Sequence, residues 1–397
     1  MAKDPLPRAV PEDVGMSSER LALLGRFVEA EVSGGRLPGA VVAVARRGKL
    51  VALDAYGHRD KAIGARMAVD SIFSVASMTK PMVAVAALQL LEYGLLHMDQ
   101  PLSTWFPRFA DARVAVMDDS KETIVATVPA RPIAIQDLLR HTSGLSYGRS
   151  GTTVAHKAFP LSSEAASREH DGDALLRLLA SLPLPHQPGT IWEYGFGLDV
   201  LGLVIEKVTD QPLGLYLWEN LWRPLGLDDT SFVLLEDKLR RHAKALQPEL
   251  IPSPTQPRKF ESGGMGMFST AGDYLRFAQM LLDGGTLDGA RILGRKTVEY
   301  MLADHLGSAI ENRVGGGSIV HADHGFGLGV AVRTTPGVVR TLGSVGEFSW
   351  PGAFGTYWWA DPREELAAVW MACTPAPAQR AHYRYVVNSL VNQAIAD

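Results

Sequence analysis

Cysteine is almost absent from this sequence of 397 residues, in which Cys373 is the only example. A single thiol excludes an intrachain disulfide and a metal cluster built on several cysteines. Cys373 ends the apolar run 366–373. We therefore expect it to be a small residue of the hydrophobic core rather than a reactive thiol.

Long apolar runs and an excess of charge of one sign are also missing. No segment reaches the length that a membrane-spanning helix requires, and residues 1–15 contain no apolar stretch of the kind found in signal peptides. The formal net charge is −4, which provides no basic surface for nucleic acid or an anionic membrane. Hydrophobic residues make up 46% of the chain, as in ordinary globular proteins. We expect a cytoplasmic protein without nucleic-acid or membrane partners.

The first part of the chain predicts a helix followed by a β-hairpin. Apolar residues recur with helical spacing over 18–32, and two glycines follow. Two short apolar runs, 40–45 and 50–53, then flank a basic turn that contains Gly48, which is typical of a hairpin. From about residue 87 to 240 the patterns are mostly helical and are broken by proline and glycine.

Strand-like patterns return toward the C-terminus and precede a final helix at 379–396. Residues 361–365, which include Pro362, are expected to form the turn between the last two strands. The expected strands cover 327–333, 338–342, 355–360 and 366–373.

Strands at both ends of the chain, with helices between them, indicate one sheet built from both termini. The lack of regular alternation between strands and helices favours the α+β class. We expect an antiparallel sheet flanked by helices, with an inserted, mainly helical domain. Residues 1–86 and 240–397 are predicted to form the sheet domain and 87–239 the helical domain, with the active site between them.

Ser77 and Lys80 form the most informative pair in the sequence. They stand three residues apart, which places them on the same face of a helix. In a dry environment the serine is a candidate nucleophile and the lysine its base, because burial disfavours the charged form of the amine. Chance alone gives roughly one such match in a chain of this composition, so the pair gains meaning only from its surroundings.

The surroundings of the pair favour a catalytic role. Pro81 suits the first turn of a helix, where a backbone N–H is dispensable. Ser77 therefore lies at a helix start, where free N–H groups and the helix dipole stabilise developing negative charge. The run 81–91 is apolar on all sides, which predicts a central, buried helix rather than a surface helix capped by a serine.

Four motifs, in order along the chain, carry a resemblance to a known family. They are the segment 73–80 around Ser77 and the segments 137–145, 222–230 and 263–273. With these motifs, the chain resembles the serine β-lactamase and penicillin-binding-protein superfamily over nearly its whole length. Within that group it is most similar to the family VIII carboxylesterases, which resemble class C β-lactamases. The resemblance implies the β-lactamase-like fold and an active site that needs no metal or organic cofactor.

Tyr194 matches the tyrosine of the family's second motif, and the resemblance implies that it is the proton shuttle for Ser77. A nearby Lys80 ammonium would stabilise the phenolate, so that protons could pass among the three side chains in both directions. Family members often carry an asparagine two residues after this tyrosine, whereas this chain has Phe196. An aromatic wall in place of an amide argues against the recognition of amide substrates.

The stretch from Trp350 to Ala353 matches the third motif, which reads Lys-Thr-Gly in most β-lactamases. The lysine is missing here, as it is in the esterase relatives, and an indole offers only a donor N–H in its place. Gly352 suits a close approach of the backbone, and the resemblance implies that the N–H groups of Ser77 and Ala353 form the oxyanion hole. The residues that we expect to contact the substrate are Phe196, Trp350, Gly352 and Tyr147.

A second serine motif suggests a different hydrolase fold. Residues 144–148 spell Gly-x-Ser-x-Gly around Ser146, which is the nucleophile elbow of α/β-hydrolases. That elbow requires a strand before it and a helix after it. Here a helix end precedes the motif and a polar loop follows, so a turn is the better interpretation.

Two further groups of polar residues are interpreted as solvated. The glycine-rich loop that holds His321, Asp323 and His324 offers two imidazoles and a carboxylate, but a zinc site needs three or four organised ligands. Glu193, next to Tyr194, is interpreted as an exposed glutamate at a loop bend. We therefore predict no metal site.

The sequence predicts a serine carboxylesterase that hydrolyses short-chain or small apolar esters through an acyl-enzyme. Ser77 attacks the ester, Lys80 and Tyr194 move its proton, and water then releases the acid. A β-lactamase, D-peptidase or amide hydrolase of the same fold is the first alternative. A non-catalytic penicillin-binding sensor is the second, although a pure binder has no use for a proton shuttle.

Overall fold

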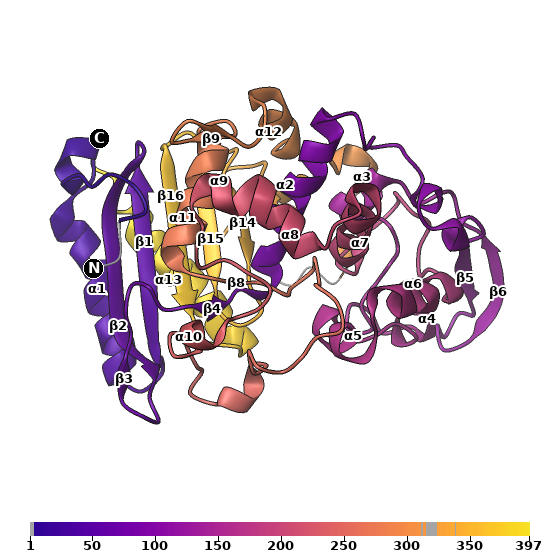
Figure 1. Cartoon of the computed structure of the whole chain (residues 1–397), viewed down its shortest axis with the longest axis horizontal. Coiled ribbons are helices and arrows are strands. Elements are labelled where there is room, and N and C mark those ends of the chain that lie inside the picture. Colours follow the sequence, from indigo (N-terminus) through magenta and orange to yellow (C-terminus); the bar gives the residue numbers. More distant parts are fainter. Residues whose placement is uncertain (1–3, 311–312, 315–323, 338) are drawn as a thin grey trace.

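An antiparallel sheet of eight strands forms the framework of the protein and combines strands from both ends of the chain (Figure 1). The computed structural model describes residues 4–310, 313–314, 324–337 and 339–397. Neighbouring strands follow the order β12-β13-β14-β15-β16-β1-β2-β3. The strands are β1 (Gly39–Arg46), β2 (Lys49–Asp60), β3 (Ala65–Arg66), β12 (His324–Phe326), β13 (Ala331–Arg333), β14 (Phe348–Pro351), β15 (Tyr357–Asp361) and β16 (Leu366–Ala372).

The predicted hairpin of β1 and β2 is confirmed, and it pairs with the last strand of the chain. Val42 in β1 lies opposite Trp370 in β16 on one side and opposite Asp54 in β2 on the other. At the turn, Arg47 and Gly48 have φ angles of 51° and 69°, as a two-residue loop of this kind requires. Strands from the two ends of the chain therefore lie side by side within one sheet, as the strand pattern indicated.

Helices cover both faces of the sheet, and for this reason every residue of β1 is buried. Successive side chains of a strand point to opposite faces. Val42 packs with residues of α1 (Ser18–Ser33) and α13 (Pro377–Asn392). Val41 belongs to the larger core, which includes α11 (Ala271–Leu282) on the opposite face.

The central helix is α2 (Thr79–Glu92), and a single 3₁₀ turn, η2 (Ala76–Met78), leads into it. All of its residues from Thr79 to Leu90 are buried, which confirms the prediction made from its continuous apolar sequence. It packs against α7 (Gly197–Thr209) and α8 (Leu213–Leu217) of the following segment. The start of α2 is thus enclosed by parts of the chain that are far apart in sequence.

The segment expected to be mainly helical also contains a β-hairpin. Its strands, β5 (Arg113–Met117) and β6 (Ile124–Pro129), lie at the far end of the molecule from α1 (Figure 1). The division of the chain into two domains stays a prediction. The remaining helices of this segment are η3 (Leu102–Thr104), η4 (Pro107–Phe109), α3 (Ile135–Leu139), α4 (Val154–Lys157), α5 (Ser163–Glu169), α6 (Gly172–Ser181), η5 (Trp218–Trp222), α9 (Arg223–Leu225) and α10 (Glu236–Leu239).

Two of the four predicted C-terminal strands are confirmed, as β15 and β16, and two are corrected. Only the end of the stretch 327–333 is a strand, because Gly329 has a φ of 82° and the chain bends before β13. Residues 339–342 form no strand. Instead, the Arg333 guanidinium donates hydrogen bonds to the carbonyl oxygens of Thr341 and Leu342, which removes these acceptors from a strand ladder. Val338 lies outside the described residues.

Three further features of the described chain are a buried thiol, the lack of a membrane-spanning helix among the described residues, and several short elements. Cys373 is a free, buried thiol, as predicted. None of the helices in the described ranges combines the length and the apolar character that crossing a membrane requires. The remaining elements are η1 (Pro11–Val14), η6 (Pro248–Leu250), α12 (Arg295–Met301), η7 (Gly307–Ala309), the pair β4 (Phe73–Ser74) and β8 (Phe268–Ser269), the pair β7 (Trp192–Glu193) and β11 (Arg313–Val314), and the pair β9 (Thr286–Leu287) and β10 (Ala290–Arg291).

Candidate active site

Ser77 lies in η2, at the entry to α2. The residue before it, Ala76, has a φ of 46°, which is uncommon for a residue that carries a Cβ atom. Thr79 Oγ1 donates a hydrogen bond to Ala76 O (2.7 Å), and Tyr274 OH donates one to Met78 O (2.7 Å). These contacts hold a strained turn in place, and such strain is concentrated at functional sites. Ser77 is partly exposed between buried neighbours.

Lys80 is completely buried, and its amine has two close neighbours. Nζ donates a hydrogen bond to the carbonyl oxygen of Gly264 (2.5 Å). It also lies 4.5 Å from the centre of the Tyr194 ring, whose π-face attracts a cation. The structure therefore brings together Lys80 and Tyr194, which the sequence predicted as partners, beside the turn that bears Ser77.

A buried carboxylate, Asp199 on α7, binds the backbone N–H of Gly264, the residue whose carbonyl binds Lys80. Its Oδ1 accepts hydrogen bonds from Gly264 N (3.2 Å) and Ser262 Oγ (2.5 Å). Burial raises the pKa of Asp199, and the positive charge of Lys80 opposes that rise. One residue thus connects the two charges, because the Gly264 N–H donates to the carboxylate and the Gly264 carbonyl accepts from the amine.

The other oxygen of Asp199 leads to Tyr147. Ser163 Oγ donates to Asp199 Oδ2 (2.6 Å) and lies 2.6 Å from Tyr147 OH. Burial, followed by the charge of Asp199, raises the pKa of Tyr147 well above 10. Tyr147 is buried, and its ring stands edge-on to Tyr194 at 5.5 Å between centroids. Tyr147 therefore packs against the Tyr194 ring on its buried side. The contact of Tyr147 with substrate stays a prediction.

Asp199 lies in none of the motifs recognised in the sequence, although a signal was present. A lone carboxylate in α7 interrupts a helix that is otherwise apolar around Asp199, from Leu198 to Ile205. Charged side chains are almost never fully buried unless they are paired. Such a residue in such a helix therefore indicates a polar network, even before its partners are known.

Aromatic rings surround Tyr194, which directly follows β7. The ring centroid of His141 lies 4.6 Å away, that of Trp350 5.4 Å and that of Trp192 6.3 Å. The Tyr194 hydroxyl is buried and has no hydrogen-bond partner among the described residues. It is therefore available to a reacting group, since a phenol O–H needs a partner when it is buried.

His141 is a second residue that the sequence analysis did not assign. It adopts a φ of 56° and is buried, and neither of its ring nitrogens has a hydrogen-bond partner within the described ranges. Burial, together with the charge of Lys80, lowers the pKa of His141 well below its ordinary value of 6.5. His141 is therefore a neutral ring beside Tyr194 at physiological pH.

The third motif lies at the turn between β14 and β15, against the segment that leads to Ser77. A Cβ atom on Gly352 would lie 2.4 Å from Val75 O and 2.1 Å from Thr356 Oγ1, so only glycine allows this approach. The carbonyl of Ala353 accepts a hydrogen bond from Arg380 Nη1 (2.8 Å). The N–H of Ala353 has no acceptor in the described part of the chain.

Phe196 and Trp350, both predicted substrate contacts, are buried in this structure. Phe196 has no exposed surface and packs edge-on against Tyr147, with 4.7 Å between centroids. Trp350 packs against Tyr194 and, at 5.3 Å, against Phe326. Trp350 thus packs against Tyr194 and Phe196 against Tyr147, and direct contact of either ring with a substrate stays a prediction.

Ser146 occupies a turn and not a nucleophile elbow. It is fully buried, and Ser146 Oγ donates to the carbonyl of Tyr147 (3.0 Å) and to the Glu193 carboxylate. Its backbone forms an isolated bridge with Gly195, and neither a strand before it nor a helix directly after it is present in this described stretch. The required strand–turn–helix context is absent there.

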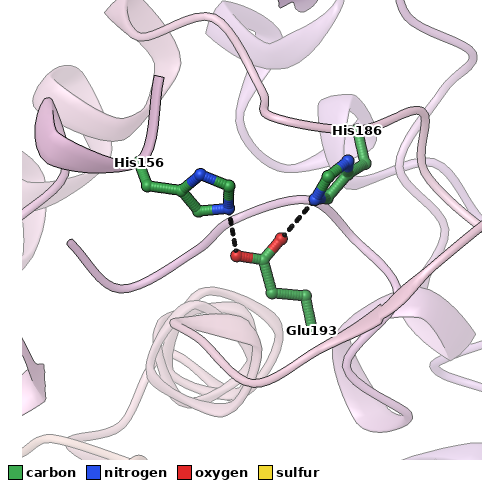
Figure 2. A group of neighbouring side chains, drawn as sticks. All are labelled: His156, His186 and Glu193. Carbon is green, nitrogen blue, oxygen red and sulfur yellow. Dashed lines mark ion pairs between the residues drawn. The ribbon is translucent and has the colours of Figure 1, made fainter. Parts of the chain in front are cut away.

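Glu193 is buried, and its interpretation as an exposed loop residue was wrong. Its carboxylate oxygens lie 2.8 Å from His156 Nε2 and 3.0 Å from His186 Nε2 (Figure 2). Burial disfavours the charge, but these histidines and Ser146 outweigh it and lower the pKa of Glu193 to about 2. Local sequence patterns do not reveal these two histidines as partners, because they lie 37 and 7 residues before Glu193 in the chain. Of the predicted solvated loop, residues 321–323 lie outside the described residues, whereas His324 begins strand β12 and is partly buried, which corrects its assignment to a loop.

The fold and the site agree with one protein family. The family model described as Beta-lactamase matches residues 24–393. The chain belongs to the beta-lactamase family. As a member of it, the chain is a serine hydrolase, and the resemblance seen in the sequence motifs is confirmed over almost its entire length.

Relatives within the beta-lactamase family include an esterase. Protein Rv1367c of Mycobacterium tuberculosis is 38% identical over 350 residues, which cover 85% of this chain and 86% of that protein. Esterase EstB of Burkholderia gladioli is 33% identical over 350 residues, which cover 82% of this chain and 83% of EstB. The solved structure of EstCE1, described as a hydrolase with promiscuous acyltransferase activity, has a TM-score of 0.77 and 26% identity, covering 94% of this chain and 98% of that one.

Proposed function

We propose that the protein is a carboxylesterase that hydrolyses small apolar esters through an acyl-enzyme on Ser77. The position of the Lys80 amine carries the proposal. The amine is buried, bound to Gly264 O and covered by the Tyr194 ring, one helical turn after Ser77. The names of EstB, an esterase, and EstCE1, a hydrolase with acyltransferase activity, support an ester as the substrate.

Acylation begins when Ser77 Oγ attacks the ester carbonyl carbon. Whichever of Lys80 and Tyr194 is deprotonated receives the hydroxyl proton, and the Tyr194 hydroxyl, which is unpartnered among the described residues, then passes a proton to the departing alkoxide. The C–O bond to the alcohol breaks as the new C–O bond to Ser77 forms. The N–H groups of Ser77 and Ala353 hold the oxyanion, and one such donor contributes about 3 kcal/mol to transition-state stabilisation.

Deacylation repeats these steps with water in place of serine. Tyr194 and Lys80 take a proton from the water, which attacks the acyl carbon, and Ser77 leaves with that proton. The Asp199 network keeps the Gly264 carbonyl in place for Lys80 throughout both half-reactions. The same groups thus serve as base and acid in turn.

The residues around the site favour apolar, uncharged substrates. Trp350 stands where most β-lactamases have the lysine of the third motif, and Phe196 stands where family members often have an asparagine. Neither replacement provides a positive charge or an amide for an anionic amide substrate. Efficient turnover of β-lactams or D-peptides is therefore the weaker alternative.

A paired assay tests the proposal. The purified protein is incubated with p-nitrophenyl butyrate and with a chromogenic cephalosporin, alongside Ser77→Ala and Ser146→Ala. We expect ester hydrolysis by the unchanged protein and by Ser146→Ala. Ser77→Ala should lose at least about a thousandfold in kcat, because the nucleophile is missing.

The competing functions give different results in the same assay. Faster turnover of the cephalosporin than of the ester would assign the chain as a β-lactamase. Loss of ester hydrolysis in Ser146→Ala alone would move the nucleophile to the second serine motif. Binding of either compound without turnover would indicate a sensor. Each of these outcomes contradicts the esterase proposal.

A further inference from the structure

The cluster of His156, His186 and Glu193 has no part in the proposed reaction, yet two of its members are almost completely buried. The side chains of His156 and Glu193 are 3% and 1% exposed, and that of His186 is 21% exposed. Figure 2 shows the two imidazole rings on either side of the carboxylate, each facing a different oxygen. The ligand atoms of the three side chains all lie within 4.8 Å of one another.

The contacts within this cluster are ion-pair contacts that lack the geometry of hydrogen bonds. Both Nε2 atoms come close to Glu193, but neither has a hydrogen-bond partner of normal geometry among the described residues, and the same holds for Glu193 Oε2. A buried polar atom that lacks a well-formed hydrogen bond costs up to about 1–3 kcal/mol. Three such atoms that converge on one point would all be satisfied by a single cation.

The orientation of the rings is set by contacts outside the cluster. Thr153 Oγ1 lies 2.7 Å from His156 Nδ1, so the second nitrogen of that ring is held by a hydroxyl, as is usual for metal-binding histidines. Gly151 packs against the face of the same ring, since a Cβ atom there would lie 2.6 Å from three of its atoms. The His186 carbonyl would lie 2.8 Å from a Cβ on Gly144. These contacts thus restrain the ring of His156 and the backbone of His186.

We propose that His156, His186 and Glu193 form a binding site for one zinc-like divalent metal ion. Two imidazoles and a carboxylate are a donor set that suits Zn²⁺. Ligands about 2.1 Å from one ion are at most about 4.2 Å apart, so small rotations of these side chains close the site. Ser146 Oγ, already at the Glu193 carboxylate, or a water molecule completes a four-coordinate shell.

The ion would have a structural role and not a catalytic one, as a clamp that holds three segments of the chain together. It joins α4, the loop that contains His186, and the end of β7. Glu193 immediately precedes Tyr194, so the clamp fixes the backbone from which Tyr194 extends. The ion contacts neither Lys80 nor Gly264, whose hydrogen bond lies in the Asp199 network. This inference goes beyond the proposed esterase activity and does not depend on it.

Metal binding is measured directly, without substrate. Full-length protein stripped with a chelator and dialysed is titrated with ZnCl₂ by calorimetry, and its melting temperature is recorded with and without zinc. We expect one equivalent of zinc per chain and a higher melting temperature in zinc. His156→Gln, His186→Gln and Glu193→Gln should each weaken binding at least about tenfold, and Thr153→Val about tenfold.

Two controls separate this site from other histidines of the chain. His97→Gln alters an exposed histidine and should leave zinc binding unchanged. The double variant His321→Gln/His324→Gln removes the other His-rich motif of the sequence and should also bind zinc normally. Binding that disappears in the double variant and persists in the three ligand variants would overturn the proposal.

A measurement on the unchanged protein covers the case in which a variant does not fold. Diethyl pyrocarbonate modifies accessible histidines, and peptide mass spectrometry locates the modified rings. Zinc should protect His186 from modification at least about tenfold and leave His97 fully reactive, because coordination occupies the Nε2 lone pair. Equal modification of His186 with and without zinc, or the absence of zinc binding by calorimetry, refutes the site. Esterase activity can be present or absent in either case.

Discussion

Gly264 is the residue on which the position of the Lys80 amine depends most directly. Its carbonyl accepts from Lys80 and its N–H donates to Asp199. A Cβ atom on Gly264 would lie 2.3 Å from Asp199 Oδ2 and 2.5 Å from Ser163 Oγ. No side chain fits there without displacing the carboxylate, so the choice of glycine is a requirement of the network.

Gly264→Ala should therefore lower kcat for a p-nitrophenyl ester by about a hundredfold, because a shift of about 1 Å in a catalytic group has an effect of that size. We also expect a loss of about 1–3 kcal/mol in the free energy of unfolding, as for other overpacked interiors. Steady-state kinetics and urea denaturation measure the two effects.

The matched control is Gly272→Ala, at the start of α11. A Cβ atom there meets nothing closer than 3.6 Å, and alanine favours a helix over glycine. This variant should keep its kcat and gain up to about 1 kcal/mol in stability. Equal activity of the two variants would show that the Gly264 peptide does not position Lys80.

Lys80 and Tyr194 should affect the rate and not the binding of substrate. Lys80→Ala and Tyr194→Phe are each expected to lower kcat about 10²–10⁴-fold, the usual contribution of a group that transfers protons. KM should change by less than about threefold, because neither group is assigned to substrate recognition. A Tyr194→Phe variant with full kcat would exclude the phenol from the proton path.

At the scale of elements, the site depends on the turn between β14 and β15 resting against η2. Thr356 Oγ1 donates to Val75 O (3.3 Å), and Gly352 N donates to Thr356 O (2.8 Å). The turn therefore approaches the backbone next to Ser77, and the approach sets where the Ala353 N–H lies relative to the nucleophile.

Gly352→Ala should separate these two elements. The added methyl group would collide with Val75 O and Thr356 Oγ1, and the loss of one oxyanion donor costs about 10²–10³ in kcat. Kinetics on an ester substrate measure the loss, and near-ultraviolet circular dichroism tests whether the fold persists. Retention of more than about a tenth of kcat would show that the turn adapts and that the oxyanion hole is formed elsewhere.

At the scale of the whole molecule, burial of His242 makes stability depend on pH. His242 is 6% exposed, and its Nε2 lies 3.0 Å from Ser74 Oγ of β4. Burial, followed by the charge of Lys244, lowers the pKa of His242 from 6.5 to about 4. The unfolded chain then binds a proton between pH 6.5 and 4 that the folded chain does not bind. The contribution of neutral His242 to the free energy of unfolding is therefore complete above pH 6.5 and falls as the pH drops toward 4.

We expect the free energy of unfolding of the unchanged protein, relative to His242→Gln, to fall by about 3 kcal/mol between pH 7 and pH 4. Urea denaturation at several pH values measures the difference. The comparison with His242→Gln removes the opposite effect of Asp273, whose pKa burial raises to about 6. His97→Gln should follow the unchanged protein, and parallel curves for His242→Gln and the unchanged protein would contradict the assignment.

Much of the fold was available from local patterns. The continuous apolar run after Lys80 gave a buried central helix, and the two runs around Gly48 gave the β1–β2 hairpin. Local patterns predicted a strand wrongly where a side chain, and not a neighbouring strand, binds the backbone carbonyl groups. Between β13 and β14, Arg333 binds carbonyl groups that a strand would have used, and no local pattern contains that information.

The sequence by itself determined the candidate nucleophile, its lysine and the matching tyrosine, because each lies in a short motif with its own spacing and context. Only the tertiary structure decided what surrounds them. Asp199, Gly264 and Ser163 meet at one point although they lie far apart in the chain, and Glu193 lies between two histidines instead of facing solvent. Buried charges must find partners, and those partners are chosen by the folding of distant segments against one another and not by neighbours in the sequence.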